Sequence, residues 1–492
     1  MMTEFELILL IVGLLLFSSV IASKYSGKIK MPALLLFLLI GMIAGSDGPG
    51  GLYFDDYKLS QMISVIALIF ILFSGGLETN KNQIKSVMGK GLLLSTMGVA
   101  ITAVIFGMFA KIFMSLTWLE GLLLGSIIAS TDAAAVFSIL RSKQIGVKNE
   151  IQSLAEFESG SNDPMAILLT ITFIELITKP SLPIFQLIGL LIWQIVWGAL
   201  AGYFAARGVV WLSKKLRIET EGIYLVITIA FSIFIYSVVN LTKGSGFLAL
   251  YISGIIIGNG QILRKKTISR FHNAIAWLMQ IIMFLTLGLL VFPKKLIPLA
   301  GIGILLSFIL IFIARPVSVI ACLSLFKMKF KEKVMVSWLG MRGAVPIVLA
   351  IFPLTRGIQK SEIMFNIVFF IVLISILLQG TTIPFVAKLL KVNIPLNKRK
   401  KSPIEFEPEN ELSSELIEYE IQENSQAIGK TLKEIDFPKG CIVVLIDRNN
   451  DYIVPEAFTV ILSGDILFVM IKKALLKDFT AKLAALEPVK EK

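Results

Sequence analysis

Two aspartates stand in the middle of long apolar segments. Asp132 lies in the stretch Ala-Ser-Thr-Asp-Ala-Ala-Ala, and Asp163 lies in Phe-Glu-Ser-Gly-Ser-Asn-Asp-Pro. A charged side chain at the centre of a membrane helix costs about 2.5–3.5 kcal/mol on insertion scales, so it normally faces a cavity or a partner. Carboxylates beside hydroxyl and amide oxygens are the donors that hard cations prefer. The two aspartates therefore predict a cation site near the middle of a membrane.

Polar residues around Asp163 have helical spacing. Glu158 and Asn162 are four residues apart, as are Ser159 and Asp163, so both pairs project from one helix face. Pro164 frees a backbone carbonyl one turn earlier. Near Asp132, small and hydroxyl-bearing neighbours allow close helix approach and an unwound backbone. The segment of Asp132 is therefore predicted to be unwound.

Three further charges interrupt or end apolar segments. Arg315 precedes a proline, and Arg342 lies in a stretch with glycines and a proline that predicts a broken helix. Glu78 ends another apolar segment. Two interpretations stay open for each residue. Glu78 either pairs inside the protein or extends toward the membrane surface, and the arginines are either structural counter-charges or ligands.

Membrane helices are the elements that must position these residues. The 492-residue chain is 56% hydrophobic and only 16% charged, against about 25% charged in soluble domains. A membrane helix needs about 20 mostly apolar residues. That rule predicts thirteen spans, near residues 5–22, 31–45, 60–78, 91–115, 119–140, 151–178, 184–212, 221–241, 246–260, 272–292, 297–326, 334–353 and 362–389.

Basic residues are concentrated in alternate loops. Each loop of one set carries more Lys and Arg than its neighbours of the other set, and the segment after the last span is also basic. The positive-inside rule then places the N-terminus outside and the C-terminal part in the cytoplasm. This distribution in a multi-pass protein of the cell membrane explains the net charge of +13 without nucleic acid as a partner.

The fifth and twelfth spans, which hold Asp132 and Arg342, are both predicted to be interrupted. They would occupy equivalent positions if the first six spans were repeated in inverted form as the last six. Inverted repeats with broken helices that cross near mid-membrane are typical of secondary transporters. The predicted fold is a polytopic α-helical membrane protein with two broken crossing helices.

Composition changes after the last span. A basic stretch, 398–401, is followed by an acidic one and then by short alternating segments separated by turn residues. We predict a transmembrane domain over 1–392, a linker over 393–409 and a small α+β cytoplasmic domain over 410–492.

These features together resemble the monovalent cation/proton antiporter superfamily, and the Asn-Asp pair resembles its electroneutral, NhaP-like branch. The matching residues are Thr131-Asp132, Glu158-Ser159, Asn162-Asp163, Arg315-Pro316, Trp338 and Arg342-Gly343. The tail is similar to the TrkA-C (RCK-C) domain. Its matching residues are Ile428–Leu432, Phe437-Pro438, Ile453–Pro455 and Gly464-Asp465. The combination resembles potassium/proton antiporters of this group.

The resemblance implies a role for each site residue. Asp163 would bind the cation or protons in turn, and Asn162 stands where electrogenic relatives have a second carboxylate, which implies electroneutral one-to-one exchange. The implied cation- and proton-binding residues are Asp163, Asp132, Thr131, Ser159, Asn162 and Glu158, with Asp163, Asp132, Thr131 and Ser159 as the ligands of the monovalent cation. Arg342 would pair with Glu78, and Arg315 with Glu158. Ala133 departs from the family, which often has proline there.

The predicted function is secondary antiport of potassium, with sodium as the alternative, by alternating access in a homodimer. A ligand-gated potassium channel is a second alternative, but the sequence has no Thr-Val-Gly-Tyr-Gly filter. Motifs of zinc proteases, serine hydrolases and Walker A nucleotide-driven pumps are also missing. We therefore expect neither an enzyme nor a cofactor.

The resemblance of the tail also implies regulation. Related domains pair across a dimer and hold a small nucleotide such as cyclic di-AMP in the interface. The contacts expected here are Arg448, Ile453, Val454 and Pro455. The alternative is that the tail only reinforces the dimer.

Overall fold

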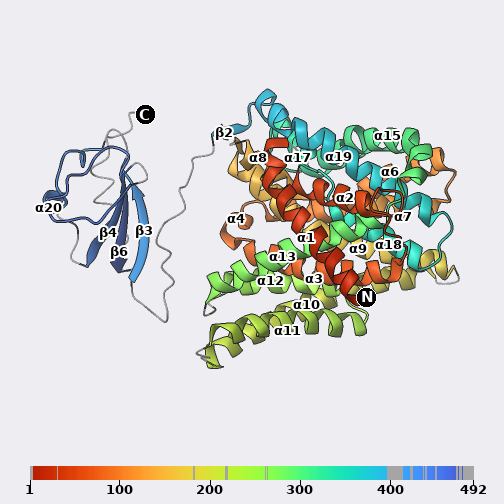
Figure 1. Cartoon of the computed structure of the whole chain (residues 1–492), viewed down its shortest axis with the longest axis horizontal. Helices are drawn as coiled ribbons and strands as arrows, with labels where there is room; N and C mark the ends of the chain where they lie inside the picture. The colour runs from red at the N-terminus through yellow and green to blue at the C-terminus, as the bar shows by residue number, and fades with distance from the viewer. Residues whose placement is uncertain are drawn as a thin grey trace. The chain divides into compact units, whose positions relative to one another are not determined.

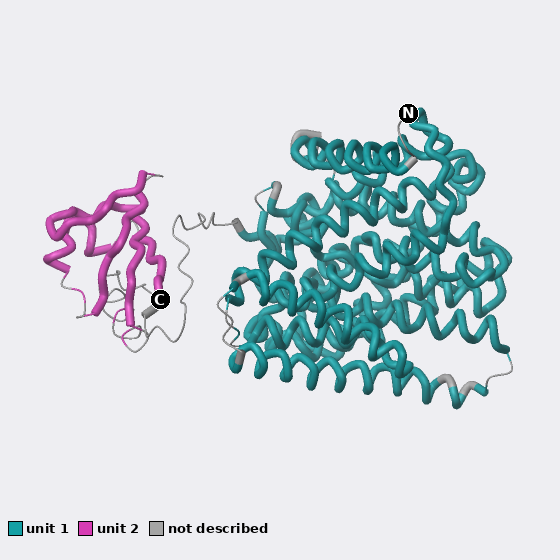
Figure 2. The backbone as a smooth tube through the Cα atoms, turned by 60° about the horizontal axis from the view of Figure 1, so that its bottom comes forward, with its two compact units in different colours: residues 1–397 teal, residues 398–492 magenta. Residues whose placement is uncertain are grey.

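The computed structural model divides the chain into two compact units, residues 1–397 and 398–492 (Figure 2). It describes residues 4–29, 32–143, 145–180, 183–216, 220–260, 262, 264–395, 414–421, 425–435, 437, 440–448, 451–472, 475 and 479. Most of the predicted linker, 393–409, lies outside the described residues.

The first unit is almost entirely helical (Figure 1). Its helices are α1 (Glu4–Ile29), α2 (Ala33–Ala44), α3 (Tyr57–Glu78), α4 (Lys81–Lys85), α5 (Met88–Leu93), η1 (Leu94–Gly98), α6 (Val99–Met114), α7 (Trp118–Ile128), α8 (Ala133–Ser142), α9 (Asn149–Thr178), α10 (Ile184–Leu216), α11 (Glu221–Leu241), α12 (Gly246–Asn259), α13 (Lys265–Leu289), α14 (Pro293–Leu296), η2 (Ile297–Leu299), α15 (Ala300–Ile309), η3 (Leu310–Ala314), α16 (Arg315–Leu323), α17 (Phe330–Trp338), α18 (Ala344–Thr355) and α19 (Ser361–Leu389).

Every predicted span coincides with helix. Among the described residues, nine helical segments are long and apolar enough to cross a membrane, and α2, α12 and α18 are shorter apolar helices. The helix α9, which carries Asp163, is 30 residues long. The polytopic helical fold is thus confirmed, whereas the count of thirteen crossings stays a prediction.

Irregularities recur in predicted spans that are seven apart. The short helices α2 and α12 form the second and ninth spans. The π-helical turns η1 and η3 interrupt the fourth and eleventh. The breaks between α7 and α8 and between α17 and α18 fall in the fifth and twelfth. This is the spacing expected of two inverted six-helix repeats separated by one helix.

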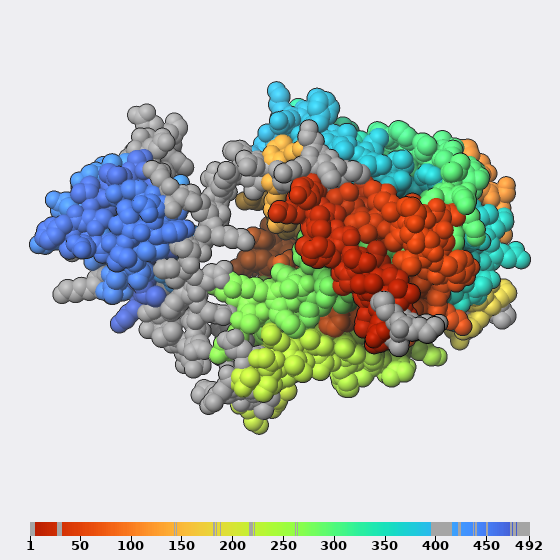
Figure 3. Space-filling model, viewed as in Figure 1, coloured from red at the N-terminus to blue at the C-terminus, as the bar shows by residue number. Residues whose placement is uncertain are grey.

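Small residues bring the helices of the first unit close together. At Gly107 of α6, a β-carbon would lie 2.6 Å from the carbonyl oxygen of Gly121 in α7. The close α6–α7 contact therefore requires glycine, as small-residue helix contacts in membranes generally do. Large apolar side chains cover the outside instead, for example Phe5 and Phe17 of α1, which is drawn in red in Figure 3. Such a surface is suited to contact with lipid.

A two-stranded antiparallel sheet joins distant parts of the first unit. β1 (Ile145–Val147) connects α8 to α9, and it pairs with β2 (Asn393–Pro395), which follows α19. Gly146 lies opposite Ile394 in this pair. The backbone N–H of Lys148 also donates to the Val392 carbonyl at 3.3 Å. The last strand of this unit therefore lies beside the connection between the two site-bearing segments.

The second unit is a small α+β domain, as predicted. Its antiparallel sheet has the strand order β3-β6-β4-β5. The elements are β3 (Ser414–Glu420), α20 (Leu432–Ile435), β4 (Cys441–Arg448), β5 (Asp451–Ile453) and β6 (Ile466–Lys472). β4 has a bulge between Val443 and Leu445. Apolar residues that include Ile446 and Leu467 form the core of this unit.

Candidate functional site

The two helix breaks meet inside the first unit. The backbone N–H of Asp132, at the first break, donates to the carbonyl of Met341, at the second, with a distance of 2.8 Å. Gly343 lies against the Asp132 carboxylate so closely that any side chain at Gly343 would collide with it. The unwound backbone of the second break therefore supplies a hydrogen-bond acceptor and a close packing contact to Asp132 at the first break.

Arg342 binds the end of α7. Its Nη1 donates to the carbonyl oxygens of Ala129 and Ser130, at 2.9 and 2.8 Å. Carbonyls at a helix C-terminus carry partial negative charge, which a cation stabilises. Arg342 is only 1% exposed, so this contact compensates a buried charge.

The predicted pair between Arg342 and Glu78 is wrong. Glu78 accepts a hydrogen bond from Asn273 Nδ2 of α13 at 2.5 Å. Asn273 in turn accepts one from Ser74 of α3 at 2.5 Å. Arg342 Nη1 donates instead to two backbone carbonyls at the end of α7.

Ser159 and Asn162 of α9 hold the first break. The Ser159 hydroxyl donates to the Thr131 carbonyl at 2.8 Å and accepts from the Ala133 N–H at 3.0 Å. Asn162 Nδ2 donates to the Thr131 hydroxyl at 2.6 Å, and Asn162 Oδ1 accepts from the Thr131 N–H at 3.4 Å. These side chains replace the backbone bonds that the helix gives up.

Asp163 lies where these elements converge. Its Oδ1 accepts a hydrogen bond from the hydroxyl of Ser130, which belongs to the first break. The residue is 8% exposed, and Ser130 is 1% exposed. Ser130 was absent from the predicted ligand set, although its position directly before Thr131-Asp132 and its hydroxyl were visible in the sequence.

Asp132 has a structural function in addition to any contact with a cation. It is the N-cap of α8, and its Oδ1 accepts from the Ala135 N–H at 3.0 Å. An N-cap carboxylate satisfies backbone donors that have no partner within the helix. Its place among the cation ligands stays a prediction.

Glu158 forms the predicted ion pair with Arg315. The distance between Glu158 Oε1 and Arg315 Nη1 is 2.6 Å, and the side chains are 2% and 5% exposed. A buried carboxylate with such a partner is already neutralised. Glu158 therefore balances a charge beside the site, and its predicted role as a cation ligand has no support in this geometry.

The site offers oxygen atoms from a carboxylate, hydroxyls, an amide and backbone carbonyls. These donors suit a monovalent cation, which is the cargo of a transporter and not a resident cofactor. Within the described part of the chain, no group of three or more His, Cys, Asp or Glu side chains is placed to hold a metal ion. Asp163 is buried and accepts a hydrogen bond from Ser130, and no ion pair involves its carboxylate among the described residues.

The predicted ligand contacts of the tail divide into two groups. Arg448 donates to both carboxylate oxygens of Asp465, at 3.0 and 2.8 Å, and to the Val460 carbonyl at 2.7 Å. The hydrogen-bonded Asp465 carboxylate raises the pKa of Arg448. Arg448 is thus engaged inside its own domain. Val454, in contrast, is 77% exposed, and its neighbours Ile453 and Pro455 are partly buried.

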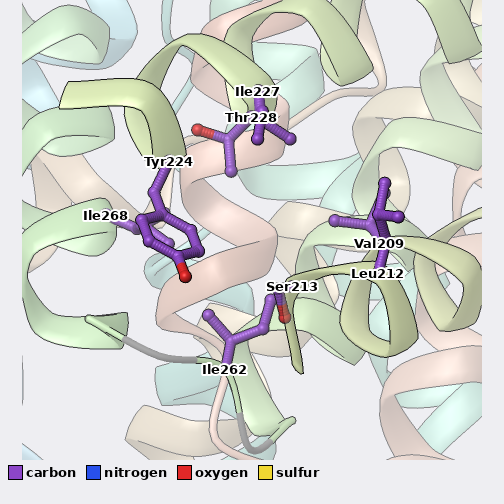
Figure 4. Close-up of a pocket in the computed structure, with 8 residues that line it drawn as sticks. All are labelled: Val209, Leu212, Ser213, Tyr224, Ile227, Thr228, Ile262 and Ile268. Carbon is purple, nitrogen blue, oxygen red and sulfur yellow. The ribbon is translucent and has the colours of Figure 1, made fainter. Parts of the chain in front are cut away.

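Two cavities lie outside the predicted site. A cavity of about 10 Å³, close to the smallest that holds one water molecule, is lined by residues of α10, α11 and α13 that include Tyr224 and Thr228 (Figure 4). A larger cavity of about 590 Å³ lies among α9, α10, α11 and α12, and Ile167 and Phe247 line it. Ile167 follows Asp163 by one helical turn, so this cavity ends near the site.

Two interrupted helices that meet at a buried carboxylate, within a bundle of membrane-length helices, define a secondary transporter. The family model of the transmembrane sodium/hydrogen exchanger matches residues 12–389, and the chain belongs to this family. The TrkA-C domain model matches residues 416–484. The protein is therefore a multi-pass membrane antiporter with a TrkA-C domain.

Known relatives cover nearly the whole chain. It is 36% identical to the K(+)/H(+) antiporter NhaP of Alkalimonas amylolytica over 98% of this chain and 84% of the relative. It is 38% identical to the K(+)/H(+) antiporter NhaP2 of Shewanella sp. (strain ANA-3), over 94% and 80%. The solved structure of the sodium proton antiporter MjNhaP1 from Methanocaldococcus jannaschii has a TM-score of 0.69 at 24% identity, and the match covers 79% of this chain and 99% of that one. This last similarity shows the shared fold.

Proposed function

We propose that this antiporter exchanges potassium for protons across the cell membrane, one for one, at Asp163. The observation that carries the proposal is the buried Asp163 carboxylate at the junction of the two helix breaks. The relatives at 36% and 38% identity are named K(+)/H(+) antiporters, which supports potassium as the cation.

Competition at one carboxylate accounts for exchange. Asp163 holds a proton or a cation but not both, so binding of one releases the other. If only the loaded protein reorients, each transport step in one direction requires a return step with the other ion. Asn162 is neutral, Glu158 is paired with Arg315, and the Asp132 carboxylate caps α8, which leaves Asp163 as the carboxylate that changes its load. Exchange should therefore move no net charge.

Alternating access requires a route to Asp163 from each side. On one side, Ser159 and Ser161 of α9 are partly exposed. On the other side, the 590 Å³ cavity is lined by Ile167, which follows Asp163 by about one helical turn. We assign the first route to the cytoplasm and the second to the outside, because the Lys and Arg distribution favours an external N-terminus.

Sodium is the second candidate for the cation. The matching family model and the archaeal structural neighbour are both named for sodium. Both ions are hard cations that take oxygen ligands, so donor type alone does not separate them. Apparent affinities for the two ions, measured on the same vesicles, decide between them.

The test uses a pH-sensitive dye in everted membrane vesicles. We expect potassium to dequench the dye in wild-type vesicles and to have no effect with Asp163→Asn. Glu150→Gln, at an exposed carboxylate in the first turn of the same helix, is the matched control and should keep exchange. Near-normal exchange by Asp163→Asn would overturn the proposal. Exchange rates that depend strongly on membrane potential would overturn the one-to-one stoichiometry.

The cytoplasmic tail is proposed to regulate exchange through β2. In the sequence, β2 precedes the linker to the tail, and β2 pairs with β1, which joins α8 to α9. A force on β2 therefore acts on the connection between Asp132 and Asp163.

The cytoplasmic orientation of the tail is tested by labelling Cys441 in a Cys322→Ser background with a membrane-impermeant thiol reagent. Labelling of intact cells, without permeabilisation, would contradict a cytoplasmic tail.

The regulatory ligand is proposed to be a small nucleotide such as cyclic di-AMP, bound by a homodimer near Ile453, Val454 and Pro455. The exposed Val454 side chain leaves this segment open to a ligand. Calorimetric titration of the purified full-length antiporter with cyclic di-AMP is the test. Heat release with a dimer mass in solution would support the proposal, and no heat would favour a tail that only reinforces the dimer.

A further inference from the structure

The second helix break separates two backbone groups that a continuous helix would join. In an α-helix, the N–H of each residue donates to the carbonyl four residues earlier. The N–H of Arg342 would therefore donate to the carbonyl of Trp338. Here α17 ends at Trp338 and α18 begins at Ala344, so both groups lose this bond. Unpaired buried backbone groups are costly.

Two side chains of α19 bridge the separated groups. The Arg342 N–H donates to the Ser375 hydroxyl oxygen at 2.9 Å. The Ser375 hydroxyl donates to Gln379 Oε1 at 2.5 Å. Gln379 Nε2 then donates to the Trp338 carbonyl at 3.1 Å. A chain of three hydrogen bonds thus stands in place of the missing backbone bond, and each donor in it has an acceptor.

The hydrogen-bonded bridge formed by Ser375 and Gln379 is fully buried. Ser375 and Gln379 are 0% and 1% exposed, and they lie one turn apart on α19, so they project from one face. Most hydroxyls in membrane helices bond to a carbonyl of their own helix, as that of Thr381 does with Leu377. The Ser375 hydroxyl instead donates to the Gln379 side chain and accepts from the backbone of the second break.

A short series of hydrogen bonds connects this bridge to Asp163. It fixes the backbone of Arg342, whose guanidinium holds the carbonyls of Ala129 and Ser130. The hydroxyl of Ser130 donates to Asp163. Movement of the second break would therefore displace the residue that directly contacts the carboxylate.

We propose that Ser375 and Gln379 are positioning residues of the antiporter, which hold the second helix break open by replacing its missing backbone hydrogen bond. The proposal deepens the proposed function and rests on it for the transport consequence. The structural consequence, a break that is held by α19, stands separately. Loss of either side chain should let the segment 338–343 move and misplace Ser130 against Asp163.

The experiment compares Ser375→Ala and Gln379→Met with Ser375→Thr, which keeps the hydroxyl, and with Thr381→Val, which removes an exposed hydroxyl of the same helix. Hydrogen–deuterium exchange of the purified antiporter reports on segment 338–343. Potassium/proton exchange in vesicles gives the apparent potassium affinity and the pH profile of transport. Melting temperatures identify variants that merely lose stability.

We expect faster deuterium uptake over 338–343 and a weaker apparent potassium affinity, by about three- to tenfold, in Ser375→Ala and Gln379→Met. The pH profile should shift in the same two variants, and Ser375→Thr and Thr381→Val should match the wild type. Unchanged deuterium uptake in this segment would overturn the proposal, as would a lower melting temperature with unchanged affinity and pH profile. Failure of the wild type to exchange ions would overturn the proposed function instead.

Discussion

Ser130 donates a hydrogen bond to Asp163 and so connects the first broken helix to α9. The carbonyl of the same Ser130 accepts from Arg342, at the second break. Ser130 therefore contacts both the Asp163 carboxylate and the Arg342 guanidinium. Under the proposed function, a change in what Asp163 binds would act through Ser130 on the junction of the two breaks.

Substitution of Ser130 should weaken cation binding without abolishing it. Ser130→Ala removes one hydrogen bond to Asp163, and such a bond to a charged group contributes about 1.5–3 kcal/mol, so we expect apparent potassium affinity to fall by at least tenfold. Ser130→Thr keeps the hydroxyl and serves as the control. Dye dequenching against potassium concentration measures both. Equal affinities in Ser130→Ala and wild type would contradict a role for this bond.

Substitution of Arg342 should cost stability as well as transport. Arg342→Met leaves the carbonyls of Ala129 and Ser130 without their donor, with an expected loss of about 2–4 kcal/mol. A melting curve of the purified protein should show a clear decrease. Arg356→Met, at an exposed arginine after α18, is the control. If Arg342→Met melted like the control, the carbonyl contact would be unimportant for folding.

Glu158 and Arg315 should behave as a coupled pair. Glu158→Gln or Arg315→Met alone leaves one buried charge without its partner, which costs about 3–5 kcal/mol. The double variant removes both charges and should recover much of that loss. A double-mutant cycle on melting temperature and expression measures the coupling. Additive effects of the two substitutions would show that the pair is not coupled.

Arg448 should stabilise the tail instead of forming a ligand site. Arg448→Gln leaves Asp465, whose side chain is 1% exposed, without its bidentate partner, at a cost of about 2–3 kcal/mol. Limited proteolysis of the full-length protein should then cut the tail faster. Lys430→Gln, at an exposed residue of the same unit, is the comparison. Unchanged cleavage together with lost nucleotide binding would return Arg448 to the ligand site.

A disulfide across the β1–β2 pair should test whether β2 couples the tail to the transport site. Gly146→Cys with Ile394→Cys places two thiols at opposite positions of the pair. We expect oxidation to slow exchange and reduction to restore it, because the bond fixes the connection between α8 and α9. The single variants under the same treatment are the controls. Exchange that oxidation leaves unaffected in the double variant would argue against coupling through β2.

The sequence was sufficient to locate the membrane helices and both breaks. Apolar length predicts a span whatever its neighbours are, and the Gly and Pro residues around Arg342 weaken a helix locally. Asp132 and Asp163 were identified because a charge in an apolar segment requires a partner. These features depend on local composition, which one chain displays directly.

The partners of the charges were harder to predict. Arg342 was expected to pair with a carboxylate, but it binds backbone carbonyls, which every residue carries and no sequence pattern marks. Ser375 and Gln379 gave no signal because isolated polar residues in a membrane helix usually bond within their own helix. Only the approach of α19 to the second break gives these two residues a function.

Competition between a proton and a cation at Asp163 is tested most directly by proton release from the purified antiporter. Potassium added to a weakly buffered sample in detergent should release about one proton per bound cation from wild-type protein and none from Asp163→Asn. Cation binding that releases no proton, or equal release by the Asp163→Asn variant, would contradict this account.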